Sequence, residues 1–117
     1  MMTTLYGIRN CDTMKKARQW LDGRRVEYAF HDYKTAGIDR TTLEKWMQHV
    51  DWTMLLNRAG TTFRKLPEDE RQDLTVEKAI TLMCRQPSMI KRPVIDTGRQ
   101  LVVGFSPAGY AALFASP

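Results

Sequence analysis

The sequence predicts an α/β fold, because its apolar pattern changes from strand to helix and back to strand within the first thirty residues. A second change of period, in the last third, predicts two strands and a final helix. A long helical middle separates these parts. We therefore expect the order β-α-β, a helical insertion at about 38–87, and then β-β-α, all within one domain spanning 1–117.

The first β-α-β unit rests on three short patterns. Thr3–Ile8 mixes β-branched, aromatic and aliphatic residues without clean alternation, as a strand buried on both faces does. A helical pattern begins at Cys11 and stops at Gly23, and its apolar face carries Met14, Ala17 and Leu21. Val26–Phe30 alternates again, so we expect a second strand parallel to the first.

The middle of the chain is predicted to be helical from its capping residues. Thr41 and Glu44 have the spacing of a capping box, and Asp51 and Thr75 each precede a further helical pattern. The polar segment Asn57–Leu66, which contains one glycine, is expected to be a connecting loop.

The last third predicts a hairpin and a helix. The runs "RPVID" and "QLVVGF" are rich in strand formers and flank the turn "DTGR". Ser106 and Pro107 follow as a capping residue and a first helical residue, and Tyr110 lies on the apolar face of the predicted helix.

Composition narrows the functional classes. The hydrophobic share of 43% and the charged share of 26% are typical of a soluble globular protein, and no apolar run is long enough to span a membrane. The start of the chain lacks the pattern of a signal peptide, and two cysteines cannot form a disulfide framework, so we expect a reducing cytoplasm. The net charge of +5 is scattered among acidic residues, which argues against nucleic-acid binding. His31 and His49 have no metal-ligand spacing, so no metal site is expected.

Cys11 lies where a strand gives way to a helix, which is the first functional signal. A helix N-terminus offers unpaired N–H groups and a partial positive charge, and both favour a thiolate. Lowering the pKa of a thiol from about 8.5 to about 6 takes about 3.4 kcal/mol. The helix dipole contributes about 0.3–1 kcal/mol, or up to about 2 when partly buried. A cation from "NRAG" or "IKRP" must therefore contribute if Cys11 is a nucleophile rather than a small core residue.

The neighbours of Cys11 leave two further questions open. Asn10 and Thr13 either donate to the thiolate or cap the helix. Met14 stands where a dithiol oxidoreductase has its second cysteine, so another thiol must resolve any adduct. Glutathione or a small partner protein is the expected source, because Cys84 falls beside an apolar helix face and is more typical of core packing.

Three segments together, "LYGIRNCDTMKKARQWL", "LLNRAGTTFRKL" and "IKRPVI", closely resemble the ArsC family of arsenate reductases and their Spx-type relatives, and above all its YffB-like subgroup. The resemblance covers essentially the whole chain. It implies a thioredoxin-like, glutaredoxin-like core with a helical insertion and a nucleophilic cysteine in the first loop. It also implies that Arg92 binds the anion or adduct and that Pro93 is a cis-proline facing the cysteine.

The resemblance also has departures. ArsC-type arsenate reductases use three arginines: Arg92 matches one, the second falls on Asn57 with Arg58 one residue away, and the third falls near Phe105. The sequence therefore does not predict arsenate as the natural substrate. Arg58 and Arg64 remain candidate anion-binding residues on a loop. Met14 removes the C-x-x-C switch that Spx-type regulators commonly carry.

Together these patterns predict a glutathione-linked reductase of disulfides or oxyanions with Cys11 as its single nucleophile. No tightly bound cofactor is expected, and glutathione is the expected co-substrate. A second thiol, from glutathione or from a glutaredoxin- or thioredoxin-type protein, is expected to release the product. The alternative is a non-catalytic, Spx-like adaptor that binds a protein partner such as RNA polymerase.

Overall fold

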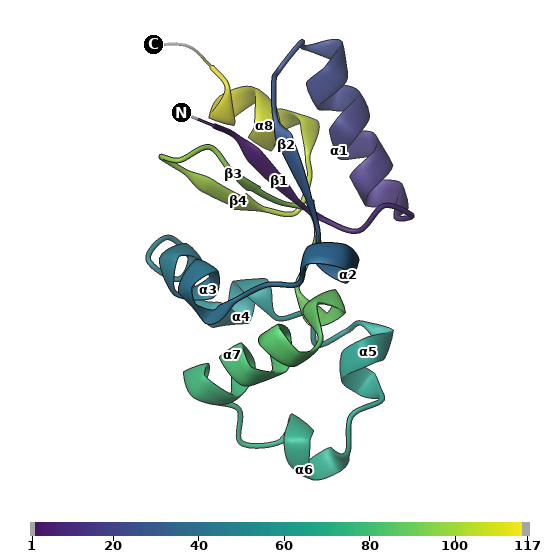
Figure 1. Cartoon of the computed structure of the whole chain (residues 1–117), viewed down its shortest axis with the longest axis vertical. Coiled ribbons are helices and arrows are strands. Elements are labelled where there is room, and N and C mark those ends of the chain that lie inside the picture. Colours follow the sequence, from purple (N-terminus) through teal and green to yellow (C-terminus); the bar gives the residue numbers. More distant parts are fainter. Residues whose placement is uncertain (1, 116–117) are drawn as a thin grey trace. The chain divides into compact units, whose positions relative to one another are not determined.

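The structure, a computed structural model, describes residues 2–115 and divides into two compact units. Unit 1 is formed by the residues up to Asp32 and from Arg92 onward, and unit 2 by Tyr33–Lys91. The element order is the predicted one: β-α-β, a run of helices, and then β-β-α (Figure 1). Within residues 2–115, no helix is both long enough and apolar enough to cross a membrane.

Unit 1 is built on a four-stranded mixed sheet with the order β2-β1-β3-β4. β1 pairs in parallel with β2 and in antiparallel with β3, and β3 pairs in antiparallel with β4 across the predicted hairpin. The strands are β1 Thr4–Gly7, β2 Ala29–Asp32, β3 Val94–Asp96 and β4 Leu101–Val103.

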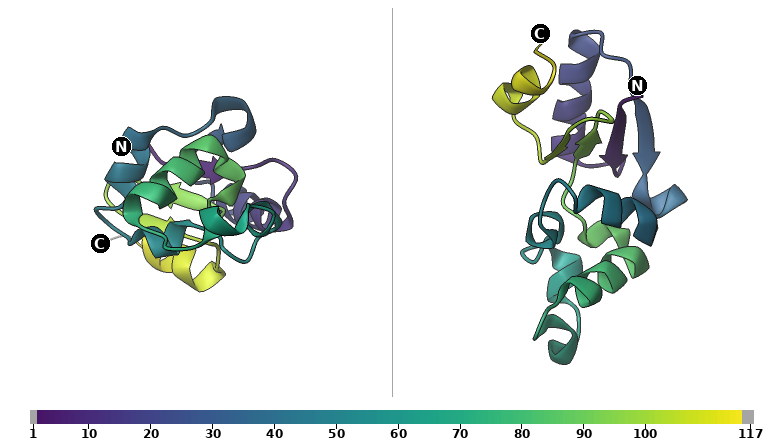
Figure 2. Two further views of the ribbon diagram at one scale, coloured as in Figure 1. Left: turned by 90° about the horizontal axis from the view of Figure 1, so that it is seen from below. Right: turned by 90° about the vertical axis from the view of Figure 1, so that its left-hand side faces the viewer.

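Two helices cover one face of this sheet (Figure 2). They are α1 Asp12–Gly23 and α8 Pro107–Leu113. Both contribute to one buried cluster with the sheet, made of Leu5, Met14, Ala17, Leu21, Ile95 and Tyr110. The Trp20 ring meets the Tyr110 ring edge-on at 5.6 Å, which joins the two helices. The predicted apolar face of α1 and the Ser106 cap of α8 are confirmed.

The strand predictions need two corrections. β1 does not bury both faces, since Leu5 and Gly7 are buried while Thr4 and Tyr6 are half-buried. The second strand is Ala29–Asp32 rather than Val26–Phe30. Arg25 adopts a positive φ after α1, so the chain needs further residues before it can align with β1.

The regular elements of unit 2 are all helices, joined by loops and by one isolated bridge between Leu56 and Ile90. Its elements are α2 Tyr33–Ala36, α3 Arg40–Trp46, α4 Trp52–Leu55, α5 Thr61–Arg64, α6 Glu68–Arg71, α7 Val76–Arg85 and the 3-10 turn η1 Pro87–Met89. Asp51 and Thr75 cap α4 and α7, as predicted. The cap of α3 is Asp39, which accepts from the Thr42 N–H, so the predicted capping box at Thr41 is wrong. The segment predicted as a loop contains α5.

Candidate active site

The sheet register brings together the two segments that carry Cys11 and Arg92. Tyr6 in β1 lies opposite Val94 in β3, and these strands run in opposite directions. The end of β1, which leads to Cys11, is therefore close to the start of β3, which follows Arg92. Cys11 and Arg92 are far apart in the sequence, but they lie close together because the neighbouring strands β1 and β3 adjoin them.

Cys11 is the N-cap residue of α1, with an extended backbone at φ −134° and ψ 131°. An N-cap side chain faces the N–H groups of the second and third helical residues, here Thr13 and Met14. The half-buried thiol makes no conventional cap hydrogen bond. The sulfur nevertheless holds the position from which Ser, Thr or Asp caps a helix.

The pKa of Cys11 lies below its ordinary value as the balance of opposing effects. Burial is the largest single effect and raises the pKa. The stabilisation of the thiolate by the Met14 N–H, the Arg92 guanidinium and the Thr13 N–H, together with the positive charge of Arg92, outweighs it. The helix end and a guanidinium thus act together on one sulfur, as the sequence-based energy comparison required.

Pro93 follows the guanidinium that acts on the sulfur. The peptide bond between Arg92 and Pro93 is cis, as the family resemblance implies, and Pro93 is buried. The Pro93 carbonyl accepts from the Gly104 N–H at 2.8 Å, a bond that ties this segment to the end of β4. The backbone that carries Arg92 is therefore fixed by the sheet.

The remaining predicted site residues separate into two groups. Thr13 contributes its backbone N–H to the sulfur, and Asn10 is exposed and is not among the groups that shift the Cys11 pKa. Arg58 and Arg64 belong to unit 2, where both are exposed, and Arg64 is the last residue of α5. Their predicted roles in substrate binding stay predictions.

Met14 contributes to the site through its backbone, which its sequence position alone does not reveal. Met14 stands where a dithiol oxidoreductase has its second cysteine, yet its N–H makes the largest single contribution among the effects that lower the Cys11 pKa. The Met14 side chain is fully buried and packs where a Gly7 side chain would be, since a Cβ there would clash with the methionine sulfur. The pattern of an N-cap followed by a buried third helical residue was the available signal.

Cys84 lies in α7 of unit 2 and is half-buried. Burial raises its pKa, and the charge of Asp39 adds to that effect while Arg40 opposes it. A thiol with a raised pKa is a weak nucleophile at neutral pH. The pKa of Cys11 is therefore lowered, whereas the pKa of Cys84 is raised.

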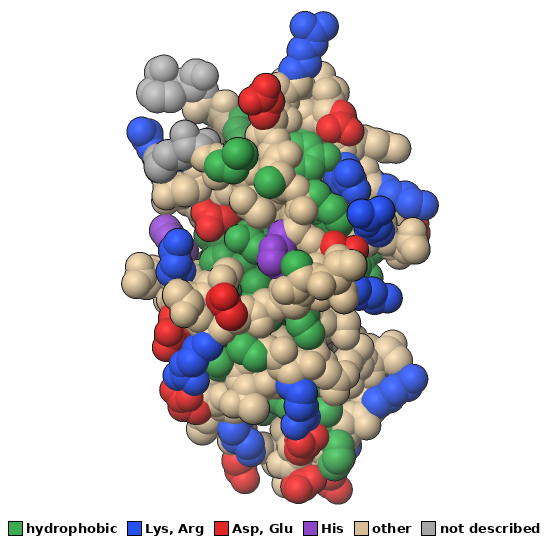
Figure 3. Space-filling view, viewed as in Figure 1, with side chains coloured by type: hydrophobic (Ala, Val, Ile, Leu, Met, Phe, Trp, Pro, Cys, Tyr) green, Lys and Arg blue, Asp and Glu red, His purple; other side chains and the backbone are tan. Residues whose placement is uncertain are grey.

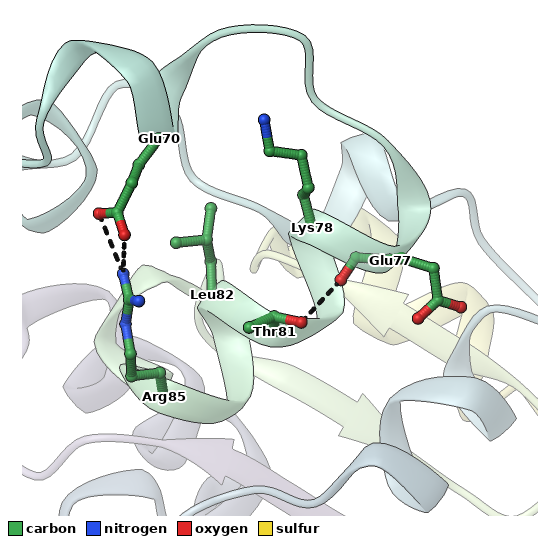
Figure 4. A pocket seen from close by; sticks show the side chains of 6 residues that line it. All are labelled: Glu70, Glu77, Lys78, Thr81, Leu82 and Arg85. Atoms are coloured by element: carbon green, nitrogen blue, oxygen red, sulfur yellow. Dashed lines mark hydrogen bonds and ion pairs between the residues drawn. The ribbon is translucent and has the colours of Figure 1, made fainter.

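Unit 2 also has a hollow of about 230 Å³ between α6 and α7 (Figure 4). The charged side chains that line this hollow already form ion pairs or hydrogen bonds with other residues of unit 2. Arg85 contacts the Glu70 carboxylate at 3.1 Å, Glu77 binds Arg40 at 2.7 Å, and the Lys78 amine donates to the Gln72 carbonyl. Within residues 2–115, no group of three or more metal-ligating side chains comes together. The polar groups of this hollow thus already have partners.

Comparison with known proteins agrees with this architecture. A protein called YFFB, of known structure, is 58% identical, with 97% of this chain and all of that one covered and a TM-score of 0.94. An arsenate reductase (ArsC) related protein from Brucella melitensis is 55% identical over 99% of this chain and 97% of its own, with a TM-score of 0.75. The global transcriptional regulator Spx of Streptococcus mutans is 28% identical over 90% of this chain and 77% of its own length.

The two solved structures share the thioredoxin-like arrangement of strands and helices seen in unit 1. The model of the ArsC family matches residues 6–113, a span that begins in β1 and ends with α8. The chain therefore belongs to the ArsC family.

Proposed function

We propose that this protein is a glutathione-linked thiol reductase in which Cys11 is the nucleophile. The observation that carries the proposal is the environment of the Cys11 sulfur, where two backbone N–H groups and the Arg92 guanidinium favour the thiolate. A thiolate is the reactive form in disulfide exchange. Glutathione is abundant in the reducing cytoplasm, where we place this chemistry.

The proposed substrate is a mixed disulfide between glutathione and another thiol. The Cys11 thiolate attacks the glutathione sulfur, a new sulfur–sulfur bond forms to Cys11, and the other thiol leaves as a thiolate that takes up a proton. A second glutathione thiolate then attacks the glutathione sulfur of this adduct, which releases glutathione disulfide and restores the Cys11 thiolate. The net result is one reduced thiol and one glutathione disulfide.

Arg92 has two roles in this scheme. Before the reaction its guanidinium stabilises the Cys11 thiolate. Once the sulfur is covalently bound and uncharged, the same guanidinium is available to a carboxylate of glutathione, which it can bind through two hydrogen bonds. With an oxyanion as substrate it would hold the anion while Cys11 replaces one oxygen, which leaves as water. A glutathione thiolate would then attack the Cys11 sulfur and form a disulfide with it. The bond between Cys11 and the central atom breaks, and the central atom leaves with the electron pair, reduced by two electrons. A second glutathione would release Cys11 from this disulfide as glutathione disulfide, as in the first scheme.

The test is a turnover assay with glutathione and purified protein, comparing a glutathionylated peptide with arsenate. We expect the peptide to be turned over by the wild type and by Cys84→Ser, and not by Cys11→Ser. The Cys84 variant is a matched control because it removes the other thiol of the chain. Loss of turnover in both variants, or in neither, would contradict the proposal, and turnover of arsenate alone would move it to oxyanions.

A second candidate function is a non-catalytic adaptor, which the similarity to Spx regulators favours. In this case the chain binds a protein partner such as RNA polymerase, and the reactivity of Cys11 is irrelevant. A pull-down with purified RNA polymerase distinguishes the two functions, because binding by an adaptor survives Cys11→Ser whereas reductase turnover does not.

A further inference from the structure

The segment that contains Cys11 and α1 carries a net positive charge. The segment 9–25 has six basic and two acidic residues, a net charge of +4, while the whole chain carries +5. Several Lys and Arg side chains gather over α1 in Figure 3. The basic residues are Arg9, Lys15, Lys16, Arg18, Arg24 and Arg25, and the acidic ones are Asp12 and Asp22.

Two of these cations lie on the same side of α1 as Cys11. Lys15 is four residues and Arg18 seven residues after Cys11, so helical periodicity aligns them in one row. Lys15 is exposed, and neither Lys15 nor Arg18 forms an ion pair with a carboxylate within residues 2–115. This row of Cys11, Lys15 and Arg18, which we call the α1 stripe, therefore carries two cations without a carboxylate partner.

Arg18 is held in place without being neutralised. Its guanidinium carbon lies 4.6 Å from the centre of the Phe30 ring, and its Nε donates to the Tyr28 hydroxyl at 3.3 Å. The Tyr28 hydroxyl in turn donates to Asp22 at 3.4 Å, so the nearest acidic group of the helix lies one turn beyond Arg18. A guanidinium fixed by an aromatic ring and a hydroxyl loses little conformational freedom on binding an anion.

Lysine in the first turns of a helix is unfavourable with respect to the helix dipole. Lys15 is in the first turns of α1 and has no carboxylate partner within residues 2–115. An anionic ligand at the stripe would offset that cost. The stripe is thus better suited to an occupied than to an empty state.

We propose that the α1 stripe docks an acidic polypeptide segment, so that the substrate of Cys11 is a mixed disulfide between glutathione and a cysteine flanked by acidic residues. This inference rests on the proposed function and specifies its substrate class. At 1.5 Å per residue, Lys15 lies about 6 Å and Arg18 about 10 Å along the helix from Cys11. An extended segment spans about 3.3 Å per residue, so acidic side chains about two and three positions from the reacting cysteine would meet these cations.

A polypeptide fits this row better than glutathione alone. The cations follow the helix away from the sulfur over about 10 Å, whereas the Arg92 guanidinium acts at the sulfur itself. Cys11 attacks the glutathione sulfur, so the departing thiol is that of the peptide. The stripe then holds the leaving group rather than the part that stays bound.

The test compares two glutathionylated peptides that differ only at the second and third positions on both sides of the modified cysteine. One peptide has Glu at these positions and the other has Gln. We expect wild-type kcat/KM to be higher for the Glu peptide. Lys15→Gln should lower the Glu-to-Gln ratio about twofold to threefold, the size expected for one exposed ion pair under partial screening.

Lys16→Gln is the matched control, because Lys16 is the adjacent exposed lysine of the same helix, turned away from the Cys11 row. It removes the same charge and should leave the Glu-to-Gln ratio unchanged. A second readout needs no turnover: the rate of Cys11 alkylation by anionic iodoacetate relative to neutral iodoacetamide should fall in Lys15→Gln and not in Lys16→Gln.

The possible results separate the two proposals. If neither peptide is turned over, the proposed function is wrong, and this inference is wrong with it. Turnover without a preference for the Glu peptide, or equal effects of the Lys15 and Lys16 substitutions, would overturn only the docking proposal.

Discussion

At the scale of single residues, the site depends on a balance at one sulfur atom. Burial raises the pKa of Cys11, while the Met14 N–H, Arg92 and the Thr13 N–H lower it by a larger amount. No N–H donor within residues 2–115 lowers the pKa of Cys84, and burial raises that pKa. The same chemical group thus becomes a candidate nucleophile in one unit and a weakly reactive thiol in the other because their surroundings differ.

Replacing Arg92 with Ala should raise the pKa of Cys11, because it removes a hydrogen bond and a positive charge while burial of the sulfur persists. The measurement is the rate of alkylation by iodoacetamide between pH 5 and 10, whose midpoint should move to higher pH. Arg99→Ala is the matched control, since Arg99 is an exposed arginine in the turn between β3 and β4. Equal midpoints for the wild type and Arg92→Ala would show that the guanidinium does not act on the sulfur.

Tyr110 offers a residue-scale test of the core. Its side chain is fully buried, and its hydroxyl has no hydrogen-bond partner within residues 2–115. An unpaired buried hydroxyl costs free energy, so we expect Tyr110→Phe to leave the free energy of unfolding unchanged or to raise it by about 1 kcal/mol. Tyr110→Ala should lower it by about 3–5 kcal/mol, because the ring is lost from the core. Denaturant titration measures both, and a loss above about 1 kcal/mol in Tyr110→Phe would reveal a partner for the hydroxyl.

At the scale of elements, the contact between β1 and α1 connects packing to chemistry. The first turn of α1 has no preceding helical turn to hold its N–H groups, and Met14 is its one fully buried side chain. Gly7 leaves the room that this side chain fills. The position of the Met14 N–H relative to the Cys11 sulfur therefore depends on a glycine in the neighbouring strand.

Gly7→Ala should lower the free energy of unfolding by about 1–3 kcal/mol and raise the pKa of Cys11, since the new Cβ displaces Met14. Thermal unfolding and the pH dependence of alkylation measure the two effects. Gly23→Ala is the matched control, because Gly23 ends α1 with no atom within 4 Å of its Cβ position, and it should not lower stability. The cost of Gly7→Ala should largely disappear in a Met14→Ala background, and an equal cost in both backgrounds would contradict the proposed contact.

Sequence reasoning predicted elements well where local chemistry decides them. Ser106, Asp51 and Thr75 cap helices as expected, because a cap depends on residues within one turn. The second strand was misplaced, since its register is set by pairing with β1. The cap of α3 was assigned to Thr41 rather than Asp39, because two polar residues near a helix start are equally suitable on sequence grounds.

The sequence predicted which residues form the candidate site better than it predicted how they act on the Cys11 sulfur. Cys11 and Arg92 follow from the strand-to-helix position and from the family resemblance. The strength of the Met14 N–H effect could not be predicted, because it depends on the position of the sulfur within the first turn. The sequence also gives no distance between Cys11 and Arg92, whose proximity results from the pairing of β1 with β3.

At the scale of the whole molecule, the candidate catalytic residues belong to one of the two units. Cys11 and Arg92 both belong to unit 1, although the entire unit 2 lies between them in the sequence. Unit 1 therefore has to be completed by strands from both ends of the chain before the guanidinium reaches the sulfur. Ionisation of Cys11 is consequently coupled to the folding of the protein.

This coupling predicts a pH dependence of stability. The pKa of Cys11 is lowered in the folded state, so the folded state releases the proton before the unfolded state does. The stabilisation is complete above the unfolded pKa of about 8.5 and is lost as pH falls through the folded pKa. The difference in unfolding free energy between the wild type and Cys11→Ser should therefore rise with pH across this window in denaturant titrations. A difference that stays constant from pH 5 to pH 9 would contradict the coupling.

The position of Cys11 as the N-cap residue of α1 has a consequence for turnover. When the sulfur enters a mixed disulfide it loses its negative charge, and the first turn of α1 and Arg92 lose the anion that they stabilise. Expulsion of Cys11 from the adduct restores that anion, and thiolates of low pKa are good leaving groups. The helix start therefore favours the regenerated enzyme over the covalent intermediate, so the protein itself promotes release.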